Sequence, residues 1–361
     1  MITPNSFKHN FLGPLVAVAI AVVMAVLILM ALGENPYVLW EAFTHTFFTS
    51  FGLGYTLFYT TPLILTGLSV ALCFHAGLFN IGSEGQLYLG AAGVIATSLL
   101  FPSLPSFLAI PLGIIFAMLA GGAWGAIAGV LKAKRGSHEV IVTILLNFIG
   151  ITFVNYLILY PFKNTEVQNP ETWPIGNNYF LIPLSQFFAH LGVDLFKTTP
   201  VNVTLFISLL AAVVCYLFLF FTSWGYEIRA VGQNPKAARV NGISNVNITI
   251  LVFMLSGALA GLVGVNEVMG FQHKLIEGFS PQYGFTGIAV ALMARNHPLG
   301  IIITAFLFGA VHNSSREIEF LSDKVTKEIA LVLEAILILF IAGQYYFLSL
   351  WDRFRKRDSH V

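Results

Sequence analysis

Residues 74–90 read FHAGLFNIGSEGQLYLG and place polar side chains inside a long hydrophobic stretch. The polar set consists of Asn80, Ser83, Glu84 and Gln86. Irregular backbone at membrane depth persists only where protein or a water-filled cavity surrounds it, and broken helices of this kind often line transport sites. The pattern predicts a broken or re-entrant segment that lines or gates a path. Glu84 has an alternative role, in which a tight interfacial turn lets its carboxylate interact with the positive end of the following helix.

Further polar residues lie in or at the end of apolar runs: Asn147, Asn155, Asn266, Glu267 and Glu334. An ionisable group inside a membrane is a functional candidate, whereas an Asn or Glu can also join neighbouring helices by hydrogen bonds. Both interpretations stay open for Glu334 and Asn147. The predicted substrate path comprises Asn80, Ser83, Glu84, Gln86, Asn147 and Asn266.

A polar, basic island, WGYEIRAVGQNPKAARVNGISNVN, occupies residues 224–247 between two hydrophobic blocks. Asn234 can cap a short helix there, Pro235 suits its first position and Gly242 ends it after Lys236–Asn241. A helix of two turns is not stable alone in water. A partner that holds it is the simplest explanation, and an ordinary cytoplasmic loop is the alternative.

Several kinds of chemistry have no motif in this sequence. It contains no G-x-x-x-x-G-K-[ST], no H-E-x-x-H and no G-x-S-x-G, and no span carries regularly spaced Arg. Cys73 and Cys215 sit in or beside apolar runs and suggest neither a disulfide framework nor a metal site. We therefore expect no catalytic residue, no metal and no cofactor bound by this chain.

The elements that position these residues must be membrane helices. Hydrophobic residues make up 57% of the chain and charged residues 10%, and the mean hydropathy is +0.82. Because a span needs about 20 apolar residues, we predict an all-α, polytopic integral membrane protein of about ten transmembrane helices. The approximate limits are 11–32, 53–73, 86–101, 107–131, 139–160, 201–222, 248–266, 280–295, 298–313 and 328–347.

Charge indicates the orientation of these spans. Alternating them from a cytoplasmic N-terminus puts twelve Lys and Arg inside and six outside, so both termini are predicted to be cytoplasmic. Residues 1–361 then form one transmembrane domain with a helical bundle at 11–347. Its loops are an extracytoplasmic one at 161–200, a cytoplasmic one at 224–247 and a basic cytoplasmic tail at 348–361. Glycines at four-residue spacing, Gly121–Gly125–Gly129 and Gly257–Gly261, predict close helix packing.

Four runs carry a family resemblance: HAGLFNIGSEGQLYLGA, HEVIVTILLNF, RAVGQNPKAARVNGI and IEGFSPQYGFTGIAVALMARNHPLG. They resemble permease subunits of bacterial ABC importers, in the ribose/nucleoside branch of the group that includes branched-chain amino acid permeases. Within that branch the chain looks like the larger of two paired guanosine-type permeases. The resemblance implies a coupling helix for an ATPase. Its residues would be Gly232, Asn234, Pro235, Lys236, Ala237, Ala238, Arg239 and Gly242.

The resemblance also implies partners. These are a cytoplasmic ATP-binding subunit that holds ATP and Mg, a second homologous permease in a hetero- or homodimer, and an extracytoplasmic substrate-binding protein or lipoprotein. The chain would contact lipid in the bacterial inner membrane and no nucleic acid. Few fixed charges in the spans favour a neutral polar cargo, nucleosides by resemblance and ribose-like sugars as the alternative. A secondary transporter or channel independent of an ATPase is the competing class, and a membrane-embedded enzyme is disfavoured.

Overall fold

The computed structural model describes residues 23–190 and 192–326, together with residues 329, 331, 332, 335, 336 and 339. Glu334, the predicted span 328–347, the tail 348–361 and most of the predicted span 11–32 lie outside the described residues. Over the described residues the regular structure is helical, and only isolated antiparallel bridges join extended segments. The chain divides into two compact units, residues 1–56 with 310–361 and residues 57–309.

Polar side chains tie the first unit together. It contains α2 (Tyr37–Phe48), the beginning of α3 (Ser50–His75) and the end of α13 (Pro298–Leu321). The buried Asn313 donates its amide to the Gly52 carbonyl at 2.9 Å and to Thr56 Oγ1 at 3.2 Å. These two bonds hold the α13 segment against the α3 segment, because a buried amide without partners would be costly.

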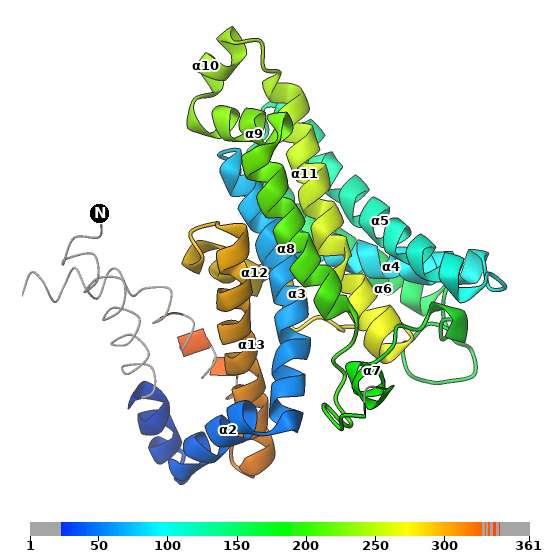
Figure 1. Cartoon of the computed structure of the whole chain (residues 1–361), viewed down its shortest axis with the longest axis vertical. Helices are drawn as coiled ribbons and strands as arrows, with labels where there is room; N and C mark the ends of the chain where they lie inside the picture. Colours follow the sequence, from blue (N-terminus) through cyan, green and yellow to red (C-terminus); the bar gives the residue numbers. More distant parts are fainter. Residues whose placement is uncertain are drawn as a thin grey trace, which may run out of the picture. The chain divides into compact units, whose positions relative to one another are not determined.

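The second unit contains the remaining helices (Figure 1). In chain order they are α4 (Ser83–Leu100), α5 (Ser106–Arg135), α6 (Glu139–Leu159), η1 (Asn177–Tyr179), α7 (Leu184–His190), α8 (Thr204–Phe221), α9 (Ser223–Gln233), α10 (Pro235–Val240), α11 (Asn245–Gly261), the π-helix η2 (Val265–Gln272) and α12 (Tyr283–Met293). The unit also includes the rest of α3 and the first half of α13. Within this unit α9 and α10 lie at one end and α7 lies at the other (Figure 1).

Membrane spans are evident from length and composition. In the described part of the chain six helical segments are long and apolar enough to cross a membrane: α3, α5, α6, α8, Asn245–Gln272 and α13. Each matches a predicted span, and α4 and the shorter apolar α12 match two more as helices. The protein is therefore a multi-pass, all-helical membrane protein, while the number ten stays a prediction. The span predicted to end at Asn266 instead continues through η2, because Val268, Met269 and Phe271 extend the apolar run.

The two glycine stripes predicted from sequence pack against each other where α5 meets α11. A methyl group added at Gly257 would overlap the Gly121 carbonyl oxygen, and one added at Gly261 would overlap the Ala117 carbonyl oxygen. Backbone therefore lies on backbone, which is how small residues hold membrane helices together. Elsewhere in this unit α6 carries large exposed apolar side chains, Ile141, Leu145 and Phe148, that suit contact with lipid.

This contact predicts a stability difference between two Gly→Ala variants. Gly257→Ala should lower the free energy of unfolding by about 1–3 kcal/mol, because an added carbon in a filled interface forces the backbone apart. Gly300→Ala, the control, places its methyl 3.4 Å from its nearest neighbour, the Ala294 carbonyl oxygen, and should be nearly neutral or slightly stabilising. Thermal unfolding in detergent checks this, and equal midpoints for the two variants would contradict it.

Candidate functional site

The break between α3 and α4 begins with a helix stop. Gly77 adopts the left-handed conformation at φ +69°, and the Leu78 amide returns to the Cys73 carbonyl at 3.0 Å. A glycine after the last helical turn takes this conformation without a steric penalty. Residues 78–82 are then non-helical until α4 begins at Ser83. The predicted broken segment is present within 74–90.

Asn80 organises a buried polar network at this break. Its side chain is fully buried, and its amide nitrogen donates to Gln86 Oε1 at 3.0 Å and to Ser256 Oγ at 2.8 Å. Its oxygen accepts the Gly82 amide at 2.8 Å. Ser256 of α11 also lies 2.8 Å from Ser69 Oγ of α3. The break is thereby bonded to two spanning helices, directly to α11 and through Ser256 to α3.

Asn147 holds the other side of the same break. Its amide nitrogen donates to the Ile81 carbonyl at 2.8 Å, and its oxygen accepts the Gly85 amide at 2.7 Å. Ser83 lies 3.0 Å from the Ser69 hydroxyl. The structure therefore brings together five of the six predicted path residues, Asn80, Ser83, Glu84, Gln86 and Asn147. All five are buried, and their side chains bond to the protein in this conformation.

Glu84 joins two helix N-termini. It lies in the first turn of α4, is 3% exposed, and accepts the Gly284 amide of the first turn of α12 at 2.7 Å. The Ser280 hydroxyl also hydrogen-bonds to this carboxyl group. An acidic group is favoured at a helix N-terminus because the first amides there lack helical partners. The alternative predicted for Glu84 named only the helix that follows it, whereas the structure adds α12.

Glu84 supports a test by two substitutions. Glu84→Ala should lower the free energy of unfolding by about 1–3 kcal/mol, because it leaves the buried Gly284 amide without an acceptor. Glu84→Gln should lose less, since its amide oxygen can accept the same bond. Thermal unfolding in detergent, with the exposed Glu166→Ala as control, checks the order. A Glu84→Ala protein as stable as the control would rule out the capping role.

Asn266, the sixth predicted path residue, belongs to a neighbouring cluster on the π-helix η2. Its oxygen accepts the Asn202 amide at 3.2 Å, and its amide donates to Glu267 Oε1 at 3.2 Å. The buried Tyr283 hydroxyl hydrogen-bonds to Glu267. The first turn of α12 is thus held by Glu84 through the Gly284 amide and by Glu267 through the Tyr283 hydroxyl. A π-helical turn often marks a functional site.

The short helix predicted in the basic island is present as α10. The Asn234 side chain accepts the amides of Lys236 and Ala237, both at 3.1 Å, Pro235 occupies the first position, and Gly242 follows at φ +83°. These details confirm the predicted cap, start and stop. A second helix, α9, directly precedes α10 and was not predicted from the sequence.

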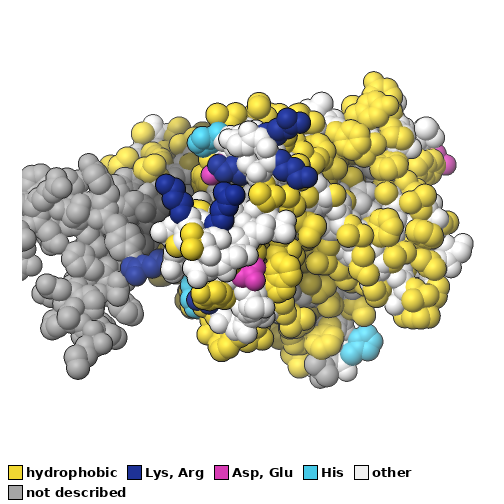
Figure 2. Space-filling model, turned by 90° about the horizontal axis from the view of Figure 1, so that it is seen from above, with side chains coloured by type: hydrophobic (Ala, Val, Ile, Leu, Met, Phe, Trp, Pro, Cys, Tyr) yellow, Lys and Arg dark blue, Asp and Glu magenta, His cyan; other side chains and the backbone are white. Residues whose placement is uncertain are grey.

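Most of α10 faces outward. Lys236, Ala237, Arg239 and Gly242 are exposed, and Val240 is 87% exposed. Figure 2, which views the protein from the α10 end, shows Lys and Arg side chains gathered on this face. Ala238 instead points inward and is buried in an apolar cluster.

Gly232, the first of the predicted coupling residues, is placed differently from the others. It lies in the last turn of α9, and a side chain there would overlap the backbone at the end of α3. It therefore packs inward and does not form part of the exposed face.

Four residues of the two clusters were not predicted as site residues: Ser69, Ser256, Asn202 and Tyr283. Single Ser, Asn and Tyr residues are common in apolar segments and give no periodic signal.

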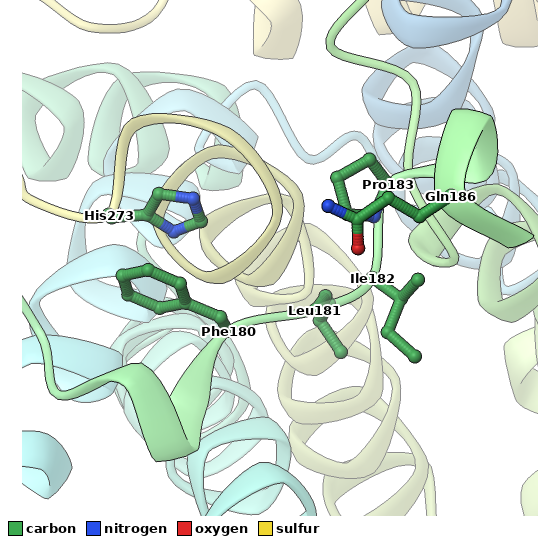
Figure 3. A pocket seen from close by; sticks show the side chains of 6 residues that line it. All are labelled: Phe180, Leu181, Ile182, Pro183, Gln186 and His273. Atoms are coloured by element: carbon green, nitrogen blue, oxygen red, sulfur yellow. The ribbon is translucent and has the colours of Figure 1, made fainter.

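A cavity of about 200 Å³ lies between the segment that leads into α7 and the residue that follows η2 (Figure 3). The rings of Phe180 and His273 stack there with centroids 3.6 Å apart and planes 14° from parallel. Burial lowers the pKa of the His273 imidazole below its ordinary value. Gln186 and Ile182 lie on the other side of the cavity (Figure 3).

These features define a multi-pass membrane protein with hydrogen-bonded breaks in its helices and an exposed short helix, an arrangement typical of a transport subunit. The chain belongs to the family of permease components of branched-chain amino acid transport systems, whose model matches residues 52–342. The match spans most of the chain and includes both the break near Asn80 and α10.

Three relatives match almost the full chain. A nucleoside ABC transporter permease of Lactococcus lactis is 34% identical over 94% of this chain and 93% of its own length. A guanosine ABC transporter permease of Bacillus subtilis is 32% identical over 97% and 98%. A glucose ABC transporter permease of Haloferax volcanii is 34% identical over 92% and 87%. The chain is therefore a membrane-spanning ABC permease and not an enzyme.

Proposed function

We propose that this chain imports nucleosides as one permease subunit of an ATP-driven transporter in the bacterial inner membrane. The similarity over nearly the whole chain to a nucleoside and a guanosine permease supports this cargo. The equally similar glucose permease makes a simple sugar the second candidate. Both cargoes are neutral and polar, which suits an interior where the buried acids Glu84 and Glu267 are bonded to the protein.

Energy comes from a partner ATPase that holds ATP and Mg and docks on α10 from the cytoplasm. The exposed outer face of α10 is the observation that supports this step, because Lys236, Arg239 and Val240 are exposed while the buried Ala238 anchors the helix to the rest of the unit. Lys236 and Arg239 are three residues apart and share one face of α10, so they suit carboxylates on the ATPase. A second homologous permease completes the path, and an extracytoplasmic binding protein delivers the cargo.

Competition for uptake tests the cargo. Cells that lack their own nucleoside and sugar uptake systems would express this chain with its partner subunits and take up radiolabelled guanosine. We expect unlabelled nucleosides to compete and glucose or ribose not to compete. Uptake of radiolabelled glucose or ribose by cells that take up no guanosine would assign the transporter to the second candidate, and uptake without any ATPase subunit would reject the proposed class.

The path itself is proposed to open beside Asn80 and Glu84. Both side chains are buried in this conformation, so a path there requires a second arrangement of the helices. Cysteines placed at Asn80 and Glu84 should react with aqueous thiol reagents in one nucleotide state of the transporter and be protected in another. Cysteines that stay unreactive in every nucleotide state would instead favour a purely packed turn.

A further inference from the structure

Two glycines put the α9–α10 segment in direct backbone contact with the break in the membrane. A methyl group at Gly232 of α9 would overlap the His75 carbonyl oxygen and lie 3.0 Å from the Ala76 carbonyl carbon and the Gly77 nitrogen. A methyl group at Gly77 would lie 3.2 Å from the Gly232 carbonyl oxygen. Because neither glycine has a side chain, the backbone at the end of α9 lies directly against the backbone at the end of α3. A movement of α9 therefore displaces the end of α3.

Apolar packing strengthens this contact. Val231 of α9 and Ala238 of α10 are buried in the same cluster as Ala76 and Leu78, the residues on either side of Gly77. Close-packed interiors transmit displacement because they have few voids into which side chains can yield. The inward side of α10 is therefore fixed to the break, while its outward side stays exposed.

The end of α3 also contacts the C-terminal end of α12. His75 Nε2 lies within hydrogen-bond distance of the Asn296 carbonyl oxygen, at 3.0 Å, in the turn after α12. The Phe220 ring meets the edge of His75 and lies 6.0 Å from the His297 ring. Since Glu84 holds the first turn of α12, both ends of that helix are bonded to residues that flank the break.

We propose that Gly77 and Gly232 are positioning residues for transport, through which movement of the docked α10 displaces the break and the Asn80 network. The inference rests on the proposed docking of an ATPase on α10. Neither glycine touches the cargo or ATP. Because glycine has no side chain, the end of α9 contacts the end of α3 directly. A movement of α10 and α9 is therefore transmitted to the break.

Gly232→Ala in the complete transporter tests this inference, with Gly300→Ala as the matched control. Proteoliposomes would contain the permease pair, the ATPase and the binding protein, and both ATP hydrolysis and cargo uptake would be measured. We expect Gly232→Ala to keep ATP hydrolysis near the control value but to lower the cargo moved per ATP about ten-fold. Unchanged cargo per ATP would overturn the inference.

Hydrogen exchange on the unmodified transporter covers the case in which Gly232→Ala fails to fold. ATP should change the exchange of backbone amides in residues 76–82 only when the ATPase is docked, because their bonds to Cys73, Asn80 and Thr143 shift with α10. If ATP leaves the exchange rates of residues 76–82 unchanged in a transporter that shows ATP-driven uptake, this inference is overturned and the proposed function is not. A wild-type transporter without ATP-driven uptake would instead reject the proposed function.

Discussion

Arg239→Glu should abolish most ATP-driven uptake while the permease stays in the membrane at its normal amount. Arg239 is exposed on α10 beside the exposed Lys236, and the fold of α10 depends on the Asn234 cap and the buried Ala238. The substitution therefore spares the fold. Placing a like charge opposite a carboxylate costs several kcal/mol at an interface, so we expect uptake to fall about ten-fold or more.

The control for this prediction keeps the charge. Arg239→Lys should retain most of the uptake, whereas adding Lys236→Glu to Arg239→Glu should deepen the loss. Radiolabelled uptake, co-purification of the ATPase and the amount of permease in the membrane would be measured on the same cells. Normal uptake by Arg239→Glu at normal expression would show that α10 does not meet an acidic surface.

Asn80→Leu should be the most damaging substitution in the membrane interior. It preserves approximate volume but leaves the Gln86 oxygen, the Ser256 hydroxyl and the Gly82 amide each without one hydrogen bond. Because each buried polar group left without a partner costs about 1–3 kcal/mol, we expect the free energy of unfolding to fall by about 2–5 kcal/mol. Uptake should be lost with it.

Asn155→Leu is the matched control, because Asn155 makes one long contact of 3.4 Å with Glu277 and its own oxygen has no partner. Thermal unfolding of both variants in the same detergent gives the comparison. If the two variants unfold at the same temperature, the network around Asn80 contributes little, and the break must be held chiefly by Asn147 and Glu84.

Local rules explain what the sequence could predict. Asn234, Pro235 and Gly242 act on their immediate neighbours, so the cap, start and stop of α10 follow from residue types alone. Apolar length likewise predicts α3, α5, α6 and α8 to within a few residues. The glycine stripes of α5 and α11 predicted close packing, although only the structure pairs them with each other.

Long-range contacts explain what the sequence could not predict. Glu84 finds its partner Gly284 two hundred residues later, and Asn80 meets Ser256 across a similar separation. No periodicity marks such pairs. The π-helix η2 was also missed, because its residues continue an apolar run and differ from an α-helix only in hydrogen bonding. Gly232 is one of the residues predicted for ATPase coupling, and its contact with the end of α3 could not be predicted from the sequence.

The central claim is that this chain forms part of a membrane path and takes its energy from another polypeptide through α10. Sealed vesicles test it directly, with this permease reconstituted either alone or with the second permease, the ATPase and the binding protein, and with ATP supplied on the α10 side. We predict cargo accumulation against a gradient only in the complete set with ATP, and its loss with Arg239→Glu. Accumulation by vesicles that contain this chain alone would contradict the account.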